Sequence, residues 1–575
     1  MFASYYDKVK KTWSGPRHNV NEYNRRSAGE VLLERMSNGD PNRVVQIDGD
    51  TGEAMVMREI RIRTIRIAQN LLKQGCTQDD RVAIIARNAH NITPLAAALL
   101  CIGTPFNALD INMIEDDSFL DILERIEPKF IFCDADAVEP ILKARLAQDT
   151  KVLIVNGKVK GFDVVESLLV STKSENEFSC QPISDLRQHT AVMICSSGST
   201  GLPKSVMLSH TLFIDEFVNN SFFVGAERML SFSSLYWISG VWAFTNSIIS
   251  KNIRIFTAKP FSPEHFCDLV GRYQVKAFLG PASRVHAVVN SEAIKTANLL
   301  TLKTFCLAGE PTPSTMIQAV RNYIPDSEFR LIYGMSEIGG MTCTTPMDID
   351  MKPTSVGCLV RGFEVKIVDE NGGNTGIDQI GEIHVKAPAM FTAYHKNDEA
   401  TRSAVDGEGF YKSGDLGYFD KDGCLFVTGR KKEIFKCNLF HIAPIEIESV
   451  VLKHPAVHSV CVVGVRDEEK LMDLPAAVIV KKDGAVLKRE EIYAFVAGMV
   501  LHSILFAEFL FLTTCNLVVE RIAEYKWLKG GIYFVDALHT TISGKILRSK
   551  VKEFANELYE KEKNVGQQIG LITNV

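Results

Sequence analysis

Short apolar runs alternate with longer helical patterns over most of the first 340 residues, and this alternation restricts the fold more than any other feature. Two of the helical stretches are Ile92–Cys101 and Pro263–Tyr273. The alternation predicts an α/β fold with doubly wound, mostly parallel sheets covered by helices, whose ligands bind beyond the carboxyl ends of the strands. The expected strands are Arg81–Ala86, Lys129–Cys133, Lys151–Asn156, Ala191–Cys195, Ile253–Thr257, Ala277–Leu279, Thr304–Leu307 and Phe329–Ile332.

One expected strand runs directly into a loop of small and hydroxylated residues that ends in Pro203-Lys204. The backbone N–H groups of such a loop can close around an anion, and the lysine adds a mobile positive charge. The pattern predicts a phosphate-binding loop, but the proline separates it from the GxxxxGK(S/T) type. A flexible surface loop is the alternative. The candidate residues are Ser196, Ser197, Gly198, Ser199, Thr200, Gly201 and Lys204.

Two further polar motifs follow expected strands, Gly309-Glu310-Pro311 and Tyr333-Gly334-Met335-Ser336-Glu337. Three motifs at strand ends indicate one shared cleft. A carboxylate near a polyphosphate is repelled unless a divalent cation lies between them, so Glu337 is a candidate Mg²⁺ ligand. A salt-bridged surface glutamate is the alternative interpretation.

From about residue 355 the pattern changes to short strands joined by tight turns, which predicts antiparallel pairing. We expect a β-barrel-like subdomain over about 355–429 at the end of a large N-terminal domain, 1–429. A hinge at 430–432 and a small, mobile α+β domain over 433–575 would follow.

Asp415 follows a glycine turn, and its carboxylate would be a good acceptor for the two hydroxyls of a ribose. Arg430 lies at the expected domain boundary and could reach the same ribose. The alternative for Asp415 is an ordinary turn aspartate. Lys545 ends the small-residue turn Thr541–Lys545, although most turn lysines are simply solvated.

The composition excludes several classes of protein. With 46% hydrophobic and 23% charged residues the 575-residue chain is typical of globular proteins, and its net charge of −5 argues against a nucleic-acid partner. Thirteen dispersed cysteines suggest reduced thiols in an intracellular compartment. We see neither a secretory signal nor a C-terminal SKL-type signal, and expect a peroxisomal or cytoplasmic protein.

In their order these motifs resemble the adenylate-forming superfamily, which comprises acyl- and aryl-CoA synthetases, luciferases and non-ribosomal adenylation domains. The signature loop is Ser196–Lys204, and Gly381–Val385 and Gly429–Lys436 also match. The resemblance extends from about Gly29 to Lys552 and is strongest with insect 4-coumarate–CoA-ligase-like or luciferase-like acyl-CoA synthetases.

The resemblance implies an AMP-forming acid–thiol ligase. The carboxylate of a fatty or aryl acid would attack the α-phosphate of ATP, giving acyl-AMP and pyrophosphate, and the thiol of coenzyme A would then displace AMP. ATP, Mg²⁺ and coenzyme A are the implied cofactors, and residues 1–429 would form the AMP-binding domain. Catalysis of this kind depends on positioning and charge neutralisation.

The contacts implied for the phosphates and metal are the loop from Ser196 to Gly201, which includes Thr200, together with Lys204, Ser336 and Glu337. Those implied for the adenosine are Gly309, Glu310, Pro311, Tyr333, Gly334, Asp415 and Arg430. The residues of the moving domain are Lys432, Lys436 and Lys545. Lys545 would stabilise charge during adenylation. Rotation about Lys432 would bring Lys436 to the thiol in the second step. Thr200 and Lys204 complete the expected catalytic set.

Four positions depart from the family pattern. Ser205 and Ala393 stand where glycine is usual, and Ser336 replaces threonine but keeps the hydroxyl. Leu439 replaces a glycine in the segment that turns toward the acceptor site, and its side chain could hinder the coenzyme A channel.

The acyl pocket also departs from the luciferases. Leu235–Gly240 replaces their His-His-Gly-Phe run, and Glu216 stands where their pocket has an arginine. Trp237 resembles the aromatic gate of fatty-acyl-CoA synthetases, with a core tryptophan as the alternative. Gly309, Gly334 and Gly339 would complete the pocket.

The largest departure is an apolar insert of about eighteen residues, Met499–Asn516. With its flanks it is long enough to span a bilayer, but Glu508 in its middle opposes insertion. An aberrant insert such as translated intron sequence is the favoured interpretation, ahead of a genuine hydrophobic insertion and a membrane anchor. A luciferase-like oxygenase and an inactive relative remain the alternatives to the ligase.

Overall fold

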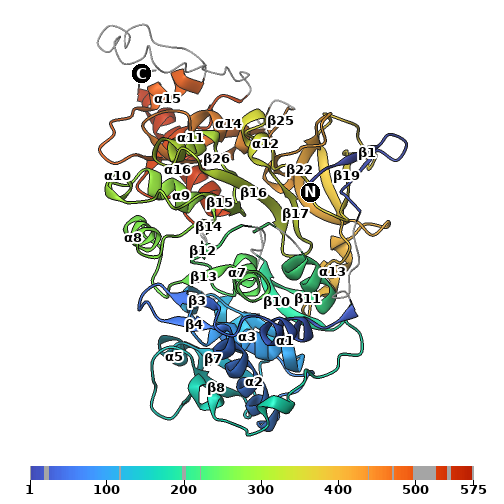
Figure 1. Ribbon diagram of the computed structural model, residues 1–575. Coiled ribbons are helices and arrows are strands. Elements are labelled where there is room, and N and C mark those ends of the chain that lie inside the picture. The colour runs from blue at the N-terminus through green and yellow to red at the C-terminus, as the bar shows by residue number, and fades with distance from the viewer. Residues whose placement is uncertain are drawn as a thin grey trace.

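The computed structural model describes residues 2–17, 25–115, 118–196, 203–219, 222–223, 225–437, 440–468, 472–496, 526–540 and 546–572. Each of the expected strands and both expected helices form within these ranges. The predicted α/β class is confirmed, because mostly parallel sheets carry helices between consecutive strands (Figure 1).

An eight-stranded sheet forms the lower part of the molecule in Figure 1. Its core strands are parallel, whereas the three at one edge, β21, β11 and β10, pair antiparallel. In spatial order the strands are β21 (Ala393–Tyr394), β11 (Lys204–Ser209), β10 (Thr190–Ser196), β6 (Phe106–Ala108), β5 (Val82–Ile85), β7 (Phe130–Cys133), β8 (Lys151–Ile154) and β9 (Asp163–Val164).

A nine-stranded sheet packs beside it and is also parallel in its centre. The antiparallel turn from β16 to β17 carries the Tyr333–Glu337 motif at one side of this sheet. In order the strands are β18 (Cys358–Leu359), β17 (Gly339–Cys343), β16 (Glu328–Met335), β15 (Thr304–Ala308), β14 (Ala277–Gly280), β12 (Arg228–Leu230), β13 (Ile253–Phe256), β3 (Val44–Asp48) and β4 (Ala54–Val56).

The expected β-rich region forms a six-stranded antiparallel sheet, but it includes the N-terminus, which the sequence did not predict. Trp13 explains the pairing, because its ring is buried against Phe419 with ring centroids 4.7 Å apart. The order is β1 (Tyr5–Asp7), β2 (Thr12–Ser14), β19 (Glu364–Val368), β20 (Gly381–Lys386), β22 (Tyr411–Phe419) and β23 (Leu425–Arg430).

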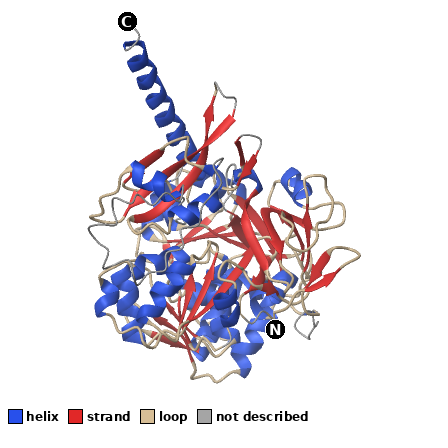
Figure 2. Ribbon diagram, turned by 90° about the horizontal axis from the view of Figure 1, so that it is seen from above, coloured by secondary structure: helices blue, strands red, loops and turns tan. Residues whose placement is uncertain are grey.

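After Arg430 the chain forms a separate small core. The hairpin of β24 (Phe435–Cys437) and β25 (Phe440–Ile442) precedes a three-stranded sheet of β26 (Val457–Asp467), β27 (Met472–Lys481) and β28 (Ile532–Val535). Figure 2 shows that α16 (Arg548–Ile572) projects from the rest of the molecule. The hinge at 430–432 stays a proposal.

The other helices cover the sheets. They are α1 (Ala28–Asn38), α2 (Met57–Lys73), α3 (Ile92–Ile102), α4 (Ser118–Ile126), α5 (Val138–Ile141), α6 (His210–Phe213), α7 (Ile238–Ile249), α8 (Pro263–Tyr273), α9 (Ala282–Val289), α10 (Ala293–Thr296), α11 (Ser314–Tyr323), α12 (Pro346–Met351), α13 (Asp398–Ala404), α14 (Pro444–Val451) and α15 (Arg489–Val496). α3 is apolar all round and buried along its length, as a helix between packed layers must be.

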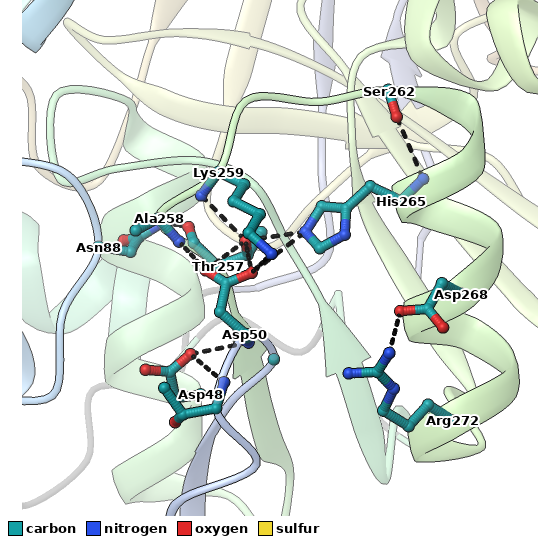
Figure 3. A network of polar contacts seen from close by, with 12 residues as sticks. Asp48, Asp50, Asn88, Thr257, Ala258, Lys259, Ser262, His265, Asp268 and Arg272 are labelled. Atoms are coloured by element: carbon teal, nitrogen blue, oxygen red, sulfur yellow. Dashed lines mark hydrogen bonds and ion pairs between the residues drawn. The ribbon is translucent and has the colours of Figure 1, made fainter.

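A polar network ties the turn after β3 to the loop after β13 (Figure 3). Asp50 accepts hydrogen bonds from the Thr257 hydroxyl and the Ala258 N–H, each at 2.9 Å, and His265 Nε2 lies 3.4 Å from it. Ser262 caps α8 by accepting the N–H of His265. The network therefore fixes one edge of the nine-stranded sheet.

In the part of the chain that the structure describes, no helix is both long and apolar enough to cross a membrane. The insert Met499–Asn516 lies outside the described residues, so its three interpretations stay as stated.

The buried His210 leads to a prediction on acid stability. Its Nδ1 accepts the N–H of Ala28 at 3.1 Å, and burial, with His189 beside it, lowers its pKa from 6.5 to about 3. Because the unfolded chain binds this proton first, stability should fall as pH drops from 6.5 toward 3, by about 1.4 kcal/mol per pH unit.

We expect His210→Asn, which keeps an acceptor near the Nδ1 position, to flatten this dependence. Denaturant midpoints of both proteins at pH 7.5 and pH 5 would check the prediction. Parallel pH dependences in the two proteins would contradict it.

Candidate active site

The phosphate-binding motif joins two antiparallel strands at the edge of the eight-stranded sheet. Ser196 ends β10 and pairs with Lys204, which begins β11, while 197–202 lie outside the described residues. Ser205, where glycine is usual, has no positive φ, and its hydroxyl donates to Asn107 Oδ1 at 2.8 Å. The substitution is therefore accommodated without a strained backbone and with a hydrogen bond of its own.

Lys204 and Glu337 both contact the same tyrosine. Lys204 Nζ lies 4.8 Å from the centre of the Tyr394 ring, and the Tyr394 hydroxyl donates to Glu337 Oε1 at 2.7 Å. Glu337 is buried in the turn between β16 and β17, which argues against the surface-glutamate alternative. Burial and the nearby Glu337 raise the pKa of Tyr394, so its proton remains available to donate.

A second polar group lies on the six-stranded sheet. Asp415, buried on β22, accepts the Tyr333 hydroxyl at 2.7 Å and lies 2.8 Å from Arg430 Nε on the neighbouring β23. Burial disfavours the charge of Arg430, but the adjacent Asp415 raises its pKa overall. The carboxylate is thus contacted by two donors from two different sheets, which is more than a turn aspartate requires.

Tyr411 links the two groups. It lies four residues before Asp415 on β22, about 13 Å along the strand, and its hydroxyl lies 3.4 Å from that of Tyr394. Burial raises its pKa, and Glu337 adds to the rise. The described site residues therefore line a polar surface at the junction of three sheets, in two groups that β22 holds about 13 Å apart.

The Gly309-Glu310-Pro311 motif follows β15 as expected, but the Glu310 side chain contacts a helix instead of facing a ligand. Gly309 has a φ of +87°, which favours glycine. Glu310 Oε2 accepts the N–H of Ser283 at 2.9 Å, so its carboxylate caps the start of α9. Adenine contacts from Glu310 would therefore come from its backbone.

Gly334 and Gly339 allow close packing at the turn beside this surface, which we call the glycine slot. A Cβ on Gly334 would lie 2.1 Å from the Gly339 carbonyl oxygen, and one on Gly339, whose φ is +79°, would lie 2.2 Å from Glu216 Oε2. The buried Glu216 accepts the N–H of Gly340 at 2.9 Å. Larger residues are excluded here for steric reasons, and Glu216 places a carboxylate against the slot.

Trp237 is the N-cap residue of α7 and is half-buried. Its ring lies edge-on to Tyr236, with centroids 4.6 Å apart, and packs against the core of the eight-stranded sheet. Its role as a gate stays a proposal.

The residues of the moving domain are only partly described. Lys432 is exposed in a short turn after β23, and Lys436 is exposed on β24. Lys431 Nζ lies 2.7 Å from Glu382 Oε2, and His384 and Lys431 lower the pKa of that carboxyl to about 2. Lys545 and Leu439 lie outside the described residues.

Four side chains of this surface were not predicted from the sequence. Asn107, Tyr394 and Tyr411 were missed as site residues, and Ser413 Oγ accepts the N–H of Asp415 at 3.0 Å. Asn107 and Tyr394 gave a weak signal because they lie in strands of three and two residues, and Tyr411 and Ser413 lie in β22 without a pattern of their own. Tyr394 follows Ala393, whose departure from glycine was the available pointer.

In the described ranges, no group of three or more His, Cys, Asp or Glu side chains could hold a metal by itself. Glu337 with the Ser336 hydroxyl offers the oxygen donors that suit Mg²⁺. A cation here would need phosphate oxygens to complete its coordination, which fits a metal that arrives with a nucleotide.

Comparisons with known families and proteins match most of the chain. The model described as AMP-binding enzyme matches residues 33–395, and that described as AMP-binding enzyme C-terminal domain matches 446–545. A probable 4-coumarate–CoA ligase 3 of Dictyostelium discoideum is 26% identical over 90% of this chain and 93% of its own length. Luciferin 4-monooxygenase of Photinus pyralis is 26% identical over 92% and 94%.

Among solved structures, the luciferase-like enzyme from the nonluminescent Zophobas morio mealworm matches with a TM-score of 0.66 and 26% identity. The match covers 72% of this chain and 99% of that one.

Proposed function

Because this chain belongs to the AMP-binding enzyme family, the adenylate-forming enzymes, we propose that it is an ATP-dependent carboxylate–CoA ligase. It would convert a fatty or aryl acid to its acyl-AMP and then to its thioester with coenzyme A. The observation that carries the proposal is the polar surface whose two groups share β22, with Asp415, Tyr333 and Arg430 in one and Tyr411, Tyr394, Glu337 and Lys204 in the other.

Each end of this surface suits one part of ATP. Asp415, held by Tyr333 and Arg430, offers acceptor oxygens to the two hydroxyls of the ribose. At the other end Lys204 offers a positive charge to the phosphates, together with the loop that includes Thr200. The distance along β22 between the two ends lets one extended nucleotide contact both.

The residues near Glu337 would act on the α-phosphate. Bound Mg²⁺, held by Glu337 and phosphate oxygens, would neutralise phosphate charge. The Ser336 hydroxyl and the amides of the glycine slot would orient the α-phosphate toward the acid. Positioned charges of this type supply most of the rate enhancement in phosphoryl chemistry.

We assign the second step to the small domain, as the family resemblance implies. Rotation about Lys432 would exchange Lys545, which serves adenylation, for Lys436, which serves thioester formation. Lys432 and Lys436 are both exposed, as residues of a moving segment must be.

A pyrophosphate-release assay with a panel of fatty and aryl acids, run with and without coenzyme A, would test the proposal. We expect acid-dependent pyrophosphate in both cases and acyl-CoA only with the thiol. ATP consumption that does not depend on any acid would contradict it.

A luciferase-like oxygenase is the second candidate. The chain is 26% identical to luciferin 4-monooxygenase of Photinus pyralis, the same identity as to the probable 4-coumarate–CoA ligase 3. This activity would adenylate an acid and then oxidise it. Glu216 against the slot and the altered Leu235–Gly240 run argue against strong light emission. Light emission and oxygen uptake with luciferin and ATP would distinguish it from the ligase.

The gate assignment of Trp237 gives a prediction on acid choice. We expect Trp237→Ala to shift the preferred acid length by about tenfold in kcat/KM, because removing the ring opens apolar volume. The KM for ATP should stay within about twofold. Acid profiles and ATP titrations of both proteins would check this.

Trp527→Ala, in the small C-terminal core, controls for the loss of a half-buried indole. An unchanged acid profile with weakened ATP binding would show that Trp237 is not the gate.

A further inference from the structure

Tyr394 lies where the three large sheets meet. It is part of β21, which pairs with β11 through Val206, so it belongs to the edge of the eight-stranded sheet. Its hydroxyl reaches Glu337 on the turn of the nine-stranded sheet and lies near the Tyr411 hydroxyl of the six-stranded sheet. Tyr394 is buried, with only 5% of its surface exposed.

The segment around Tyr394 is fixed on both sides by backbone hydrogen bonds. The N–H of Phe391 donates to the Glu337 carbonyl at 2.7 Å, and the N–H of His395 donates to the Ser205 carbonyl at 2.9 Å. Thr392 also donates to Met207 at 2.9 Å. The ring is therefore held by main-chain contacts that do not depend on the ligand.

Each part of the side chain contacts a different candidate site residue. The ring faces Lys204 Nζ at 4.8 Å, in the range of a cation–π contact. The hydroxyl donates to Glu337 Oε1 at 2.7 Å, a short bond to a charged acceptor.

We propose that Tyr394 is a positioning residue, which orients the metal-binding carboxylate of Glu337 through its hydroxyl and the phosphate-binding Lys204 through its ring. The inference rests on the proposed function, because it takes Glu337 and Lys204 as the metal and phosphate contacts. Lysine side chains lose much rotamer freedom when held, so a pre-existing contact lowers the cost of ordering Lys204 on binding.

The two contacts can be separated by substitution. Tyr394→Phe removes the hydroxyl and keeps the ring, whereas Tyr394→Leu removes both. Calorimetric titration of ATP into the full chain, without acid and with Mg²⁺ varied or chelated, measures metal-dependent and metal-independent binding.

For Tyr394→Phe we expect the Mg²⁺ concentration that gives half-maximal ATP binding to rise about tenfold, the size of one lost hydrogen bond to a charged group. ATP binding with the metal chelated should be unchanged. Tyr394→Leu should weaken ATP binding under both conditions, because it also frees Lys204.

Tyr418→Phe provides a matched control. It makes the same change on the adjoining six-stranded sheet, where Tyr418 stacks on Phe426 with centroids 4.9 Å apart. Thermal melts of all the variants report general destabilisation. The inference would be overturned if Tyr394→Phe weakened ATP binding equally with and without Mg²⁺. It would also be overturned if the half-maximal Mg²⁺ concentration did not change.

A double-mutant cycle with Glu337→Gln separates this inference from the proposed function. If the two residues act together, Tyr394→Phe should add nothing in the Glu337→Gln background. Additive effects would overturn the positioning role of Tyr394 but would leave the metal assignment of Glu337 in place. If Glu337→Gln by itself leaves the Mg²⁺ dependence unchanged, the metal assignment and this inference both fail.

Discussion

Replacing Lys545 by alanine is expected to slow acid-dependent pyrophosphate release by at least about 100-fold, the largest single effect that we predict. The reason is that negative charge shifts onto the leaving pyrophosphate as the acid attacks, and the family resemblance assigns Lys545 to that charge. The same variant should still convert pre-made acyl-AMP to acyl-CoA, because that step uses the other orientation of the small domain.

Lys550→Ala is the matched control for this change. Lys550 lies on α16, close to the Thr541–Lys545 turn in sequence, and pairs with Glu553 at 3.1 Å on an exposed surface. We expect both half-reactions of this control to stay within about twofold of the unaltered protein. Equal losses in the two half-reactions of Lys545→Ala would refute the assignment of Lys545 to adenylation alone.

The sheets could be predicted because their strands are short, apolar and regularly spaced. Helices cover both faces of a parallel sheet, so every residue of a central strand is buried and the strand forms an unbroken apolar run. Phe130–Cys133 and Ala277–Gly280 are such runs. The N-terminal strands β1 and β2 could not be found this way. Each is three residues long, and β2 joins β19 only through contacts that are distant in sequence, such as Trp13 on Phe419.

The site was predictable where a motif carries its own chemistry. Glu337 follows a strand and Asp415 follows a glycine, and the structure brings each buried carboxylate to hydrogen-bond donors. Tyr394 carries no such motif. It becomes part of the site because a two-residue strand returns from the six-stranded region to the edge of another sheet, and local sequence does not encode that pairing.

Glu310 shows the reverse case, in which the motif was recognised from the sequence but the contact of its side chain was not. Its motif stands at the predicted strand end, but the carboxylate caps α9 through the N–H of Ser283. A helix N-terminus attracts a nearby carboxylate as strongly as a ligand does, so sequence position alone could not separate the two uses.

The second large effect is expected at Asp415. Asp415→Ala removes the acceptor for Tyr333 and the counter-charge of Arg430, and we expect the KM for ATP to rise by about 30-fold or more. Some loss of thermal stability should accompany it, since a buried carboxylate with two donors is lost. Glu364→Gln, a carboxylate change on β19 of the same sheet, is the control.

A comparison of ATP with 2′,3′-dideoxy-ATP tests the reason as well as the size of this effect. If Asp415 binds the ribose hydroxyls, the unaltered protein should prefer ATP by about tenfold or more, because the analogue leaves a buried acceptor unpaired. Asp415→Ala should lose this preference, since neither nucleotide can then be recognised there. A structural role for Asp415 would instead weaken both nucleotides equally and leave the ratio unchanged, so a preserved ratio in the variant would remove Asp415 from the ribose site.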